Sequence, residues 1–283
     1  MLRYKKIFLG GPCNNNCIYC PADHKDSPQV DFSTIRNSLD QKDSDSVVLH
    51  GGEPTLRKDL PDIVNAARDK GFRRIKLLTN GRAFSNTHYL GQVMNAGCSL
   101  FEITLWGSNP NLHEYLSRAA GSFWETINGI ENVSGVPHDK FVCLRIPICK
   151  ENLSDLENVV ITALNSGANR IILSMQDPAL SFQSALPHIN NSINISIFNR
   201  VWILTEGLPF CLMQGLEQHI SEIYSGWETL YEKMYQHHKQ CAECAYKELC
   251  PGTEVRYVKQ FGDREFLPVR AGKCFQDIKV LYD

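Results

Sequence analysis

The chain has 283 residues, of which 43% are hydrophobic, a length that can bury one sizeable core and still leave a small appended unit. Lys and Arg total 29 against 31 Asp and Glu, and no basic stripe of the kind that binds nucleic acid is present. No apolar run reaches the roughly 18 residues of a membrane span, and the amino terminus has no signal-peptide pattern. We therefore expect a cytoplasmic protein that binds neither nucleic acid nor membrane.

Short apolar runs alternate along the first two thirds of the chain with segments whose apolar residues recur at helical spacing. The predicted strands are 6–11, 46–50, 74–79, 100–106, 141–148 and 170–175. The predicted helices are 31–39, 60–70, 86–95, 122–133 and 153–165. This alternation is typical of repeated βα units around a parallel sheet, so we expect an α/β fold.

The pattern changes after residue 176. Ile193, Ile195 and Ile197 alternate with polar residues, which suggests one further strand. Beyond about residue 204 the βα alternation stops, and the tail carries five cysteines: Cys211, Cys241, Cys244, Cys250 and Cys274. We therefore divide the chain into domains 1–204 and 205–283 and expect a metal to organise the second.

A cysteine-rich loop follows the first predicted strand and contains Cys13, Cys17 and Cys20. Clustered cysteines in a reducing compartment are more often metal ligands than disulfides. A four-iron cluster ordinarily takes four thiolates, so three would leave one iron open to bind a further ligand. A zinc site that borrows His24 as its fourth ligand is the alternative.

The Cys-x3-Cys-x2-Cys spacing, with an aromatic residue before the third cysteine, resembles the signature of the radical S-adenosylmethionine (SAM) superfamily. The Gly-Gly-Glu-Pro string at 51–54, directly after the second strand, is similar to a second motif of that superfamily. Residues 105–107, followed by His113, Arg118 and 121–123, resemble the fourth-strand region of members with added C-terminal clusters. The resemblance implies a partial (β/α)6 TIM-like barrel with a small cysteine-rich auxiliary-cluster domain.

The resemblance also implies cofactors and their sites. Cys13, Cys17 and Cys20 would hold a catalytic 4Fe-4S cluster, and the backbone and carboxylate of the Gly-Gly-Glu-Pro motif would engage the methionine amino group of SAM. The implied cofactor-binding residues are Gly51, Gly52, Glu53, Pro54, Thr79, Asn80, Thr104 and Arg145. Thr and Asn at strand ends are ordinarily caps, and Arg145 could equally be a structural ion-pair partner.

Such an enzyme would be an oxidoreductase or maturase that takes an electron from a donor such as flavodoxin or ferredoxin. Reductive cleavage of SAM would give methionine and a 5′-deoxyadenosyl radical, which abstracts hydrogen from a substrate. The protein would contribute orientation and exclusion of water, while the cofactor carries the difficult chemistry.

In the tail, Cys241-x2-Cys244-x5-Cys250 resembles the auxiliary-cluster segment of the SPASM and twitch subfamily. Glu254 stands where a two-cluster domain has another cysteine, which implies a single auxiliary 4Fe-4S cluster. Its fourth ligand would be Cys211, which we favour, or Cys274. A zinc ribbon, to which His237 and His238 could contribute although we expect both to be solvent-exposed, remains the alternative.

The substrate class stays open, because one fold serves many reactions. We expect a ribosomally made peptide or a small metabolite, and the position of the first cysteine at residue 13 leads us to expect no preceding peptide-recognition domain. The alternative is a zinc-stabilised, non-catalytic binding or scaffold protein, which would not need the motif at 51–54. Cys98, Cys143 and Cys149 lie in apolar segments and are expected to be small buried hydrophobes.

Overall fold

The computed structural model describes residues 4–20, 27–41, 44–137, 140–225, 235–250 and 252–270. Its main body is a parallel seven-stranded sheet whose spatial order follows the chain. The strands are β1 (Lys5–Phe8), β2 (Ser46–His50), β3 (Arg74–Thr79), β4 (Leu100–Thr104), β5 (Phe141–Ile148), β6 (Arg170–Met175) and β7 (Trp202–Glu206). β1 and β7 are not paired with each other in the described ranges, so the sheet stays open as a partial barrel. The expected α/β class is confirmed.

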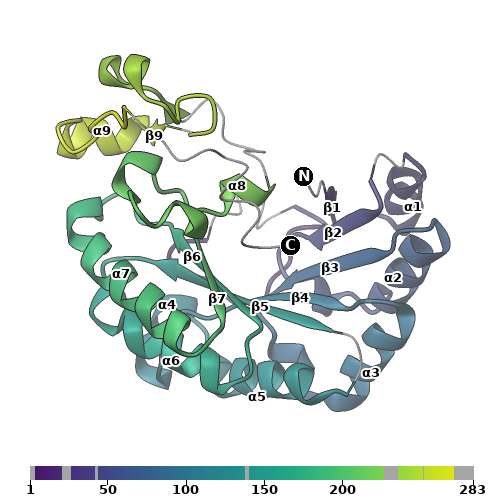
Figure 1. Cartoon of the computed structure of the whole chain (residues 1–283). Helices are drawn as coiled ribbons and strands as arrows, with labels where there is room; N and C mark the ends of the chain where they lie inside the picture. Colours follow the sequence, from purple (N-terminus) through teal and green to yellow (C-terminus); the bar gives the residue numbers. More distant parts are fainter. Residues whose placement is uncertain are drawn as a thin grey trace.

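Helices cover the outer face of the curved sheet (Figure 1). They are α1 (Phe32–Asp40), α2 (Leu60–Asp69), α3 (Thr87–Ala96), α4 (Pro110–Ser117), α5 (Ser122–Gly135), α6 (Leu156–Asn165) and α7 (Phe182–Phe198). The second helix shows why these segments fold as they do. Its buried residues Leu60, Ile63, Val64 and Ala67 recur at spacings of three and four, and a proline stands in its first turn.

The strand expected around Ile193, Ile195 and Ile197 is wrong, because these residues lie in α7. Ile193 is fully buried whereas Ile197 is 55% exposed, as the rotation of a helix requires. The seventh strand of the sheet is β7 instead, which the sequence pattern did not predict. The domain boundary proposed after residue 204 falls inside that strand, so a division after β7 suits the architecture better.

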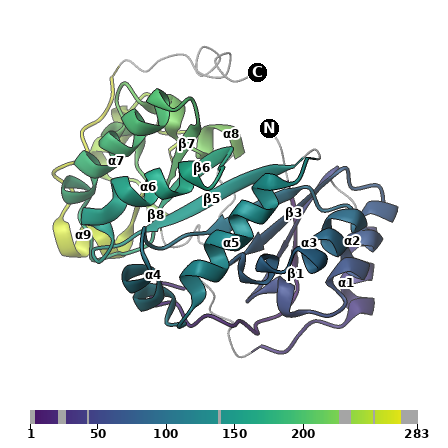
Figure 2. The same cartoon turned by 90° about the horizontal axis from the view of Figure 1, so that it is seen from below.

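Beyond β7 the chain forms a small unit of short elements. They are η4 (Phe210–Leu212), η5 (Glu217–His219), α8 (Glu222–Ser225), β8 (Tyr235–Gln236), η7 (Lys239–Glu243), β9 (Thr253–Glu254) and α9 (Val255–Phe261). Tyr257 of α9 stacks on Phe182 at the start of α7, with ring centroids 4.3 Å apart, and its hydroxyl accepts the Phe182 backbone N–H at 2.8 Å. Figures 1 and 2 both place this unit at the α7 side of the sheet, so the aromatic contact anchors it to the barrel.

Three cysteines behave as the sequence predicted. Cys98, Cys143 and Cys149 are between 0% and 6% exposed, and burial raises the pKa of each thiol to about 12. They are therefore small apolar groups at neutral pH. None of the helices in the described part of the chain is both long and apolar enough to cross a membrane.

Candidate functional site

The cysteine loop lies at the carboxyl end of β1, where the loops of a parallel barrel meet. Cys13 is exposed, and Cys17 and Cys20 are half-buried. The loop backbone is fixed to the end of α4, since Asn16 N–H donates to Ser117 O and Ile18 N–H donates to Leu116 O, both at 2.9 Å. The predicted cysteine loop is therefore held on the sheet edge. His24, the ligand of the zinc alternative, lies outside the described residues.

Arg82, in the short helix η2 (Arg82–Ser85) that follows β3, clamps the cysteine loop from the other side. Its Nη1 donates at 2.7 Å both to Asn14 O and to Asn15 Oδ1, and its Nε donates to Glu125 Oε2 at 2.6 Å. Asn80 Nδ2 adds a bond to Asn14 Oδ1 at 2.7 Å. The sequence interpretation missed Arg82, because its contacts with the cysteine loop join residues more than 60 positions apart.

Tyr19, the aromatic residue before Cys20, ties the loop to the far side of the sheet. Its hydroxyl lies 2.9 Å from Glu151 Oε2 and 3.1 Å from Asp177 Oδ2, on the segments after β5 and β6. Burial and the two carboxylates raise the pKa of Tyr19 far above its usual value, so the phenol stays a hydrogen-bond donor. The loop after β1 is thereby linked to the loops after β5 and β6.

The two glycines of the Gly-Gly-Glu-Pro motif are required by the packing of neighbouring strand ends. Gly52 N–H donates to Gly10 O at 2.7 Å. A Cβ on Gly51 would lie 2.3 Å from Gly10 O, and one on Gly52 would lie 2.0 Å from Gly11 O. The close approach that only glycine permits here is therefore to the β1 loop of the same chain.

Glu53 follows these glycines, and its carboxylate is buried at 4% exposure. Oε1 accepts from Thr55 N at 3.0 Å, Thr55 Oγ1 at 2.6 Å and Thr79 Oγ1 at 2.7 Å, and Oε2 accepts from Asn80 N at 2.7 Å. Burial raises the pKa of Glu53, although these four donors oppose the rise. They occupy most of the roughly four acceptor positions of a carboxylate. Glu53 thus joins the loops after β2 and β3, and its contact with SAM stays a prediction.

Thr104 and Arg145 are register partners on β4 and β5. Arg145 Nε donates to Glu102 Oε1 at 2.6 Å, its Nη1 pairs with Glu206, and Lys76 Nζ lies 3.2 Å from Glu102 Oε2. Burial opposes ionisation of Glu102, but Arg145 and Lys76 outweigh it and lower its pKa to about 2. Arg145 therefore forms the ion pairs expected if its role is structural. A contact between Arg145 and the cofactor stays a prediction.

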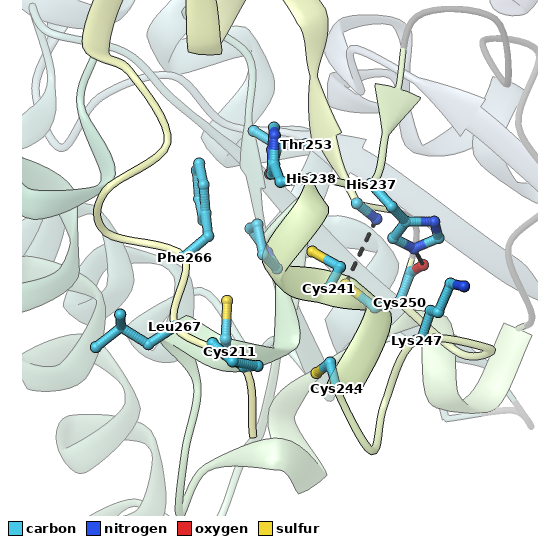
Figure 3. Close-up of a pocket in the computed structure, with 13 residues that line it drawn as sticks. Cys211, His237, His238, Cys241, Cys244, Lys247, Cys250, Thr253, Phe266 and Leu267 are labelled. Atoms are coloured by element: carbon cyan, nitrogen blue, oxygen red, sulfur yellow. Dashed lines mark hydrogen bonds between the residues drawn. The ribbon is translucent and has the colours of Figure 1, made fainter. Parts of the chain in front are cut away.

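A second cysteine site lies in the C-terminal unit. Cys211 from η4 and Cys241, Cys244 and Cys250 from the segment 239–250 line one open cavity (Figure 3). Burial, together with the three neighbouring thiols, raises the pKa of Cys211 to about 12. Within the described ranges, no three His, Cys, Asp or Glu side chains are arranged to hold a single metal ion. Cys274 lies outside the described residues.

The two histidines beside this cavity differ, so the expectation that both are solvent-exposed holds only for His237. His237 is exposed, and its Nε2 lies 2.8 Å from Cys250 O. His238 is half-buried and stacks on Phe266 at an interplanar angle of 9°.

Comparison with known proteins agrees with this architecture. The family model described as the Radical SAM superfamily matches residues 7–163, more than half of the chain. The chain therefore belongs to the radical SAM superfamily, whose enzymes use a 4Fe-4S cluster and SAM to catalyse radical reactions. Membership decides against the non-catalytic scaffold alternative.

Two curated relatives are similar over part of the chain. A probable GTP 3′,8-cyclase of Sulfurisphaera tokodaii is 27% identical over 175 residues, covering 59% of this chain and 54% of the relative. The 7,8-dihydro-6-hydroxymethylpterin dimethyltransferase of Methanocaldococcus jannaschii is 36% identical over 95 residues, covering 31% of this chain and 19% of the relative. The matches thus span about half or less of these relatives.

Solved structures share the fold at low identity. Native anSMEcpe with bound AdoMet and Kp18Cys peptide has a TM-score of 0.65 at 12% identity, covering 95% of this chain and 93% of that one. Streptococcus suis SuiB bound to precursor peptide SuiA has a TM-score of 0.57 at 15% identity, covering 73% and 49%. The likeness to anSMEcpe thus extends over the C-terminal unit as well as the sheet.

Proposed function

We propose that this protein is a radical SAM oxidoreductase with two clusters, which abstracts hydrogen from a peptide or a small metabolite. The observation that carries the proposal is the pairing of two cysteine sites. Three cysteines lie on one loop at the sheet edge, and four line one cavity in the C-terminal unit. The first set suits the 4Fe-4S cluster of the superfamily, and the second suits one auxiliary 4Fe-4S cluster.

In this proposal Cys13, Cys17 and Cys20 hold the first cluster and leave one iron for SAM. When bound, that cluster supplies the electron that cleaves SAM to the 5′-deoxyadenosyl radical. The chain's own residues hold the geometry, since Arg82 and Tyr19 fix the cysteine loop against neighbouring loops. Glu53 does the same for the loops after β2 and β3, where the SAM-binding residues are proposed to lie.

The auxiliary centre is assigned to Cys211, Cys241, Cys244 and Cys250. Four thiolates complete the protein ligands of a four-iron cluster, so no iron is left open for a substrate. This centre therefore fits a redox role better than substrate binding. A zinc ion on the same four thiols is the rival, and metal analysis separates the two.

We expect the substrate to be a peptide or a small metabolite. The enzyme would work in the cytoplasm and receive electrons from a donor such as flavodoxin or ferredoxin. The anSMEcpe and SuiB structures contain peptides, but their low identity supports only the fold. The sequence similarity to a probable GTP 3′,8-cyclase makes a nucleotide the second candidate.

The test is anaerobic reconstitution followed by metal analysis and SAM cleavage. We expect about eight irons per chain, four for each cluster, and release of 5′-deoxyadenosine with dithionite. Changing Cys13, Cys17 and Cys20 together to Ala should remove about half of the iron, four of eight, and all of the 5′-deoxyadenosine. Stoichiometric zinc without iron uptake would overturn the proposal.

A further inference from the structure

His238 presents an unsatisfied polar atom beside the four-cysteine cavity. Its side chain lines the cavity together with Cys211, Cys241, Cys244 and Cys250. The Nε2 atom is buried and has no hydrogen-bond partner among the described residues. Buried polar atoms in native proteins are nearly always paired, so an orphan at this place points to a partner that occupies the cavity.

The ring of His238 is held in a defined orientation. It stacks on Phe266 with ring centroids 5.1 Å apart and planes only 9° from parallel (Figure 3). Its backbone carbonyl accepts the N–H of Cys241 at 3.0 Å, which fixes the chain at the first cysteine of the tail. The imidazole is therefore positioned by contacts that do not involve Nε2.

The neighbouring His237 provides an internal comparison. Its Nε2 is already paired with Cys250 O at 2.8 Å, and its side chain is exposed. The two adjacent histidines thus differ in one respect that matters, since only His238 keeps a buried ring nitrogen unpaired at the cavity.

We propose that His238 Nε2–H donates a hydrogen bond to a sulfur of the auxiliary cluster, either a bridging sulfide or a cysteine Sγ, and thereby raises the reduction potential of that cluster. The inference rests on the auxiliary 4Fe-4S cluster of the proposed function. Cluster sulfides and thiolates only accept hydrogen bonds, so the imidazole supplies the donor. A donor stabilises the reduced cluster, which carries the greater negative charge, and hydrogen bonds to sulfur are among the factors that set cluster potentials.

His238 acts here as a positioning and tuning residue and not as a ligand. Four thiols already line the cavity, which is the full ligand number of a 4Fe-4S cluster. An imidazole ligand would also replace one of these thiolates, and the structure leaves all four facing the cavity (Figure 3).

The experiment compares His238→Phe, His238→Gln and His237→Phe in the full chain with Cys13, Cys17 and Cys20 changed to Ala, so that one cluster remains. Phe keeps the stacking on Phe266 but removes the donor, whereas Gln keeps an N–H donor. Iron content is measured first, and the potential is then measured by redox titration followed by electron paramagnetic resonance (EPR).

We expect all three variants to keep about four irons, the content of one cluster. His238→Phe should lower the equilibrium constant for reduction about tenfold, a shift of about 59 mV for a one-electron couple. His238→Gln should shift less, and His237→Phe should match the parent protein.

An unchanged potential in His238→Phe at full iron content would overturn the inference, as would an equal shift in His237→Phe. Loss of iron from both His238 variants would overturn it too, because it would make His238 a ligand. Absence of the cluster from the parent protein would instead refute the proposed auxiliary centre, so the two failures are distinguishable.

Discussion

The two cysteine sites of this molecule are built in opposite ways. The first uses three cysteines from one short loop, which is clamped by Arg82 and by the end of α4. The second uses Cys211 from one segment and three cysteines from another that begins 30 residues later, and all four line one cavity. Three thiolates leave an iron open, whereas four do not.

The two cysteine sites also lie in different parts of the fold. The loop site, formed by Cys13, Cys17 and Cys20, lies at the carboxyl edge of the sheet. Glu53, Thr79 and Asn80 lie at the neighbouring strand ends, where residues from several strands can contact one ligand. The C-terminal site is joined to the barrel through the aromatic contact of Tyr257 with Phe182. These differences fit the proposed division of roles, with SAM bound at the loop site and electrons carried at the C-terminal site.

The largest expected effect concerns the ligand set of the C-terminal site. Cys211→Ser should lose about half of the total iron, four of eight, because it removes one of the four thiols at the cavity. Cys274→Ser should keep the full content. Iron analysis after anaerobic reconstitution measures both, and the opposite result would replace Cys211 by Cys274 in the ligand set.

The second expected effect concerns Glu53 in the loop site. Glu53→Gln should weaken SAM binding about ten- to a hundredfold, since a hydrogen bond to a charged group contributes about 1.5–3 kcal/mol. It should also lower the unfolding temperature without SAM, because Thr55, Thr79 and Asn80 lose their charged acceptor.

The control for this change is Glu131→Gln, at an exposed position of α5. The measurements are the SAM concentration dependence of 5′-deoxyadenosine release and a thermal melt. A normal melt combined with weak SAM binding would mean that Glu53 contacts the cofactor and does not organise the loops.

A smaller effect is expected from the clamp on the cysteine loop. Arg82→Gln removes the bonds to Asn14 O and Asn15 Oδ1, so the loop cluster should lose iron to a chelator several-fold faster. The auxiliary cluster should be unaffected. Arg68→Gln, at a half-exposed position, is the matched control. If Arg82→Gln accelerated iron loss equally from both clusters, a local role for Arg82 would be contradicted.

The smallest effect on either site should come from the ion-pair network of Glu102, Arg145 and Lys76. The pKa of Glu102 is about 2 when folded against an ordinary 4.5, so its stabilisation is present above pH 4.5 and is lost as the pH falls toward 2. Urea unfolding of wild type against Glu102→Gln should show the difference in stability shrinking over that range. A difference independent of pH would mean that the carboxylate is not the stabilising group.

Much of this fold could be predicted from the sequence, because buried parallel strands are short apolar runs. The predicted strands at 46–50, 74–79, 141–148 and 170–175 coincide with β2, β3, β5 and β6. The error at Ile193 to Ile197 arose because alternate isoleucines within a polar segment fit a strand as well as a helix.

The site was predictable in part for a similar reason. Spacing identifies residues that act together within one loop, as with Cys13, Cys17 and Cys20. It does not show hydrogen bonds between distant segments, so Arg82 and the unpaired Nε2 of His238 emerged only from the structure. The same limit applied to Glu53, whose partners Thr79 and Asn80 belong to the next strand end.

The most direct test of the account is the response of each cluster to SAM. One variant with Ala at Cys241, Cys244 and Cys250 keeps only the loop cluster, and another with Ala at Cys13, Cys17 and Cys20 keeps only the auxiliary cluster. The EPR spectrum of each reduced protein is recorded before and after addition of SAM. The account predicts that SAM changes the spectrum of the loop cluster and leaves that of the auxiliary cluster unchanged. A change at the auxiliary cluster, or none at the loop cluster, would contradict it.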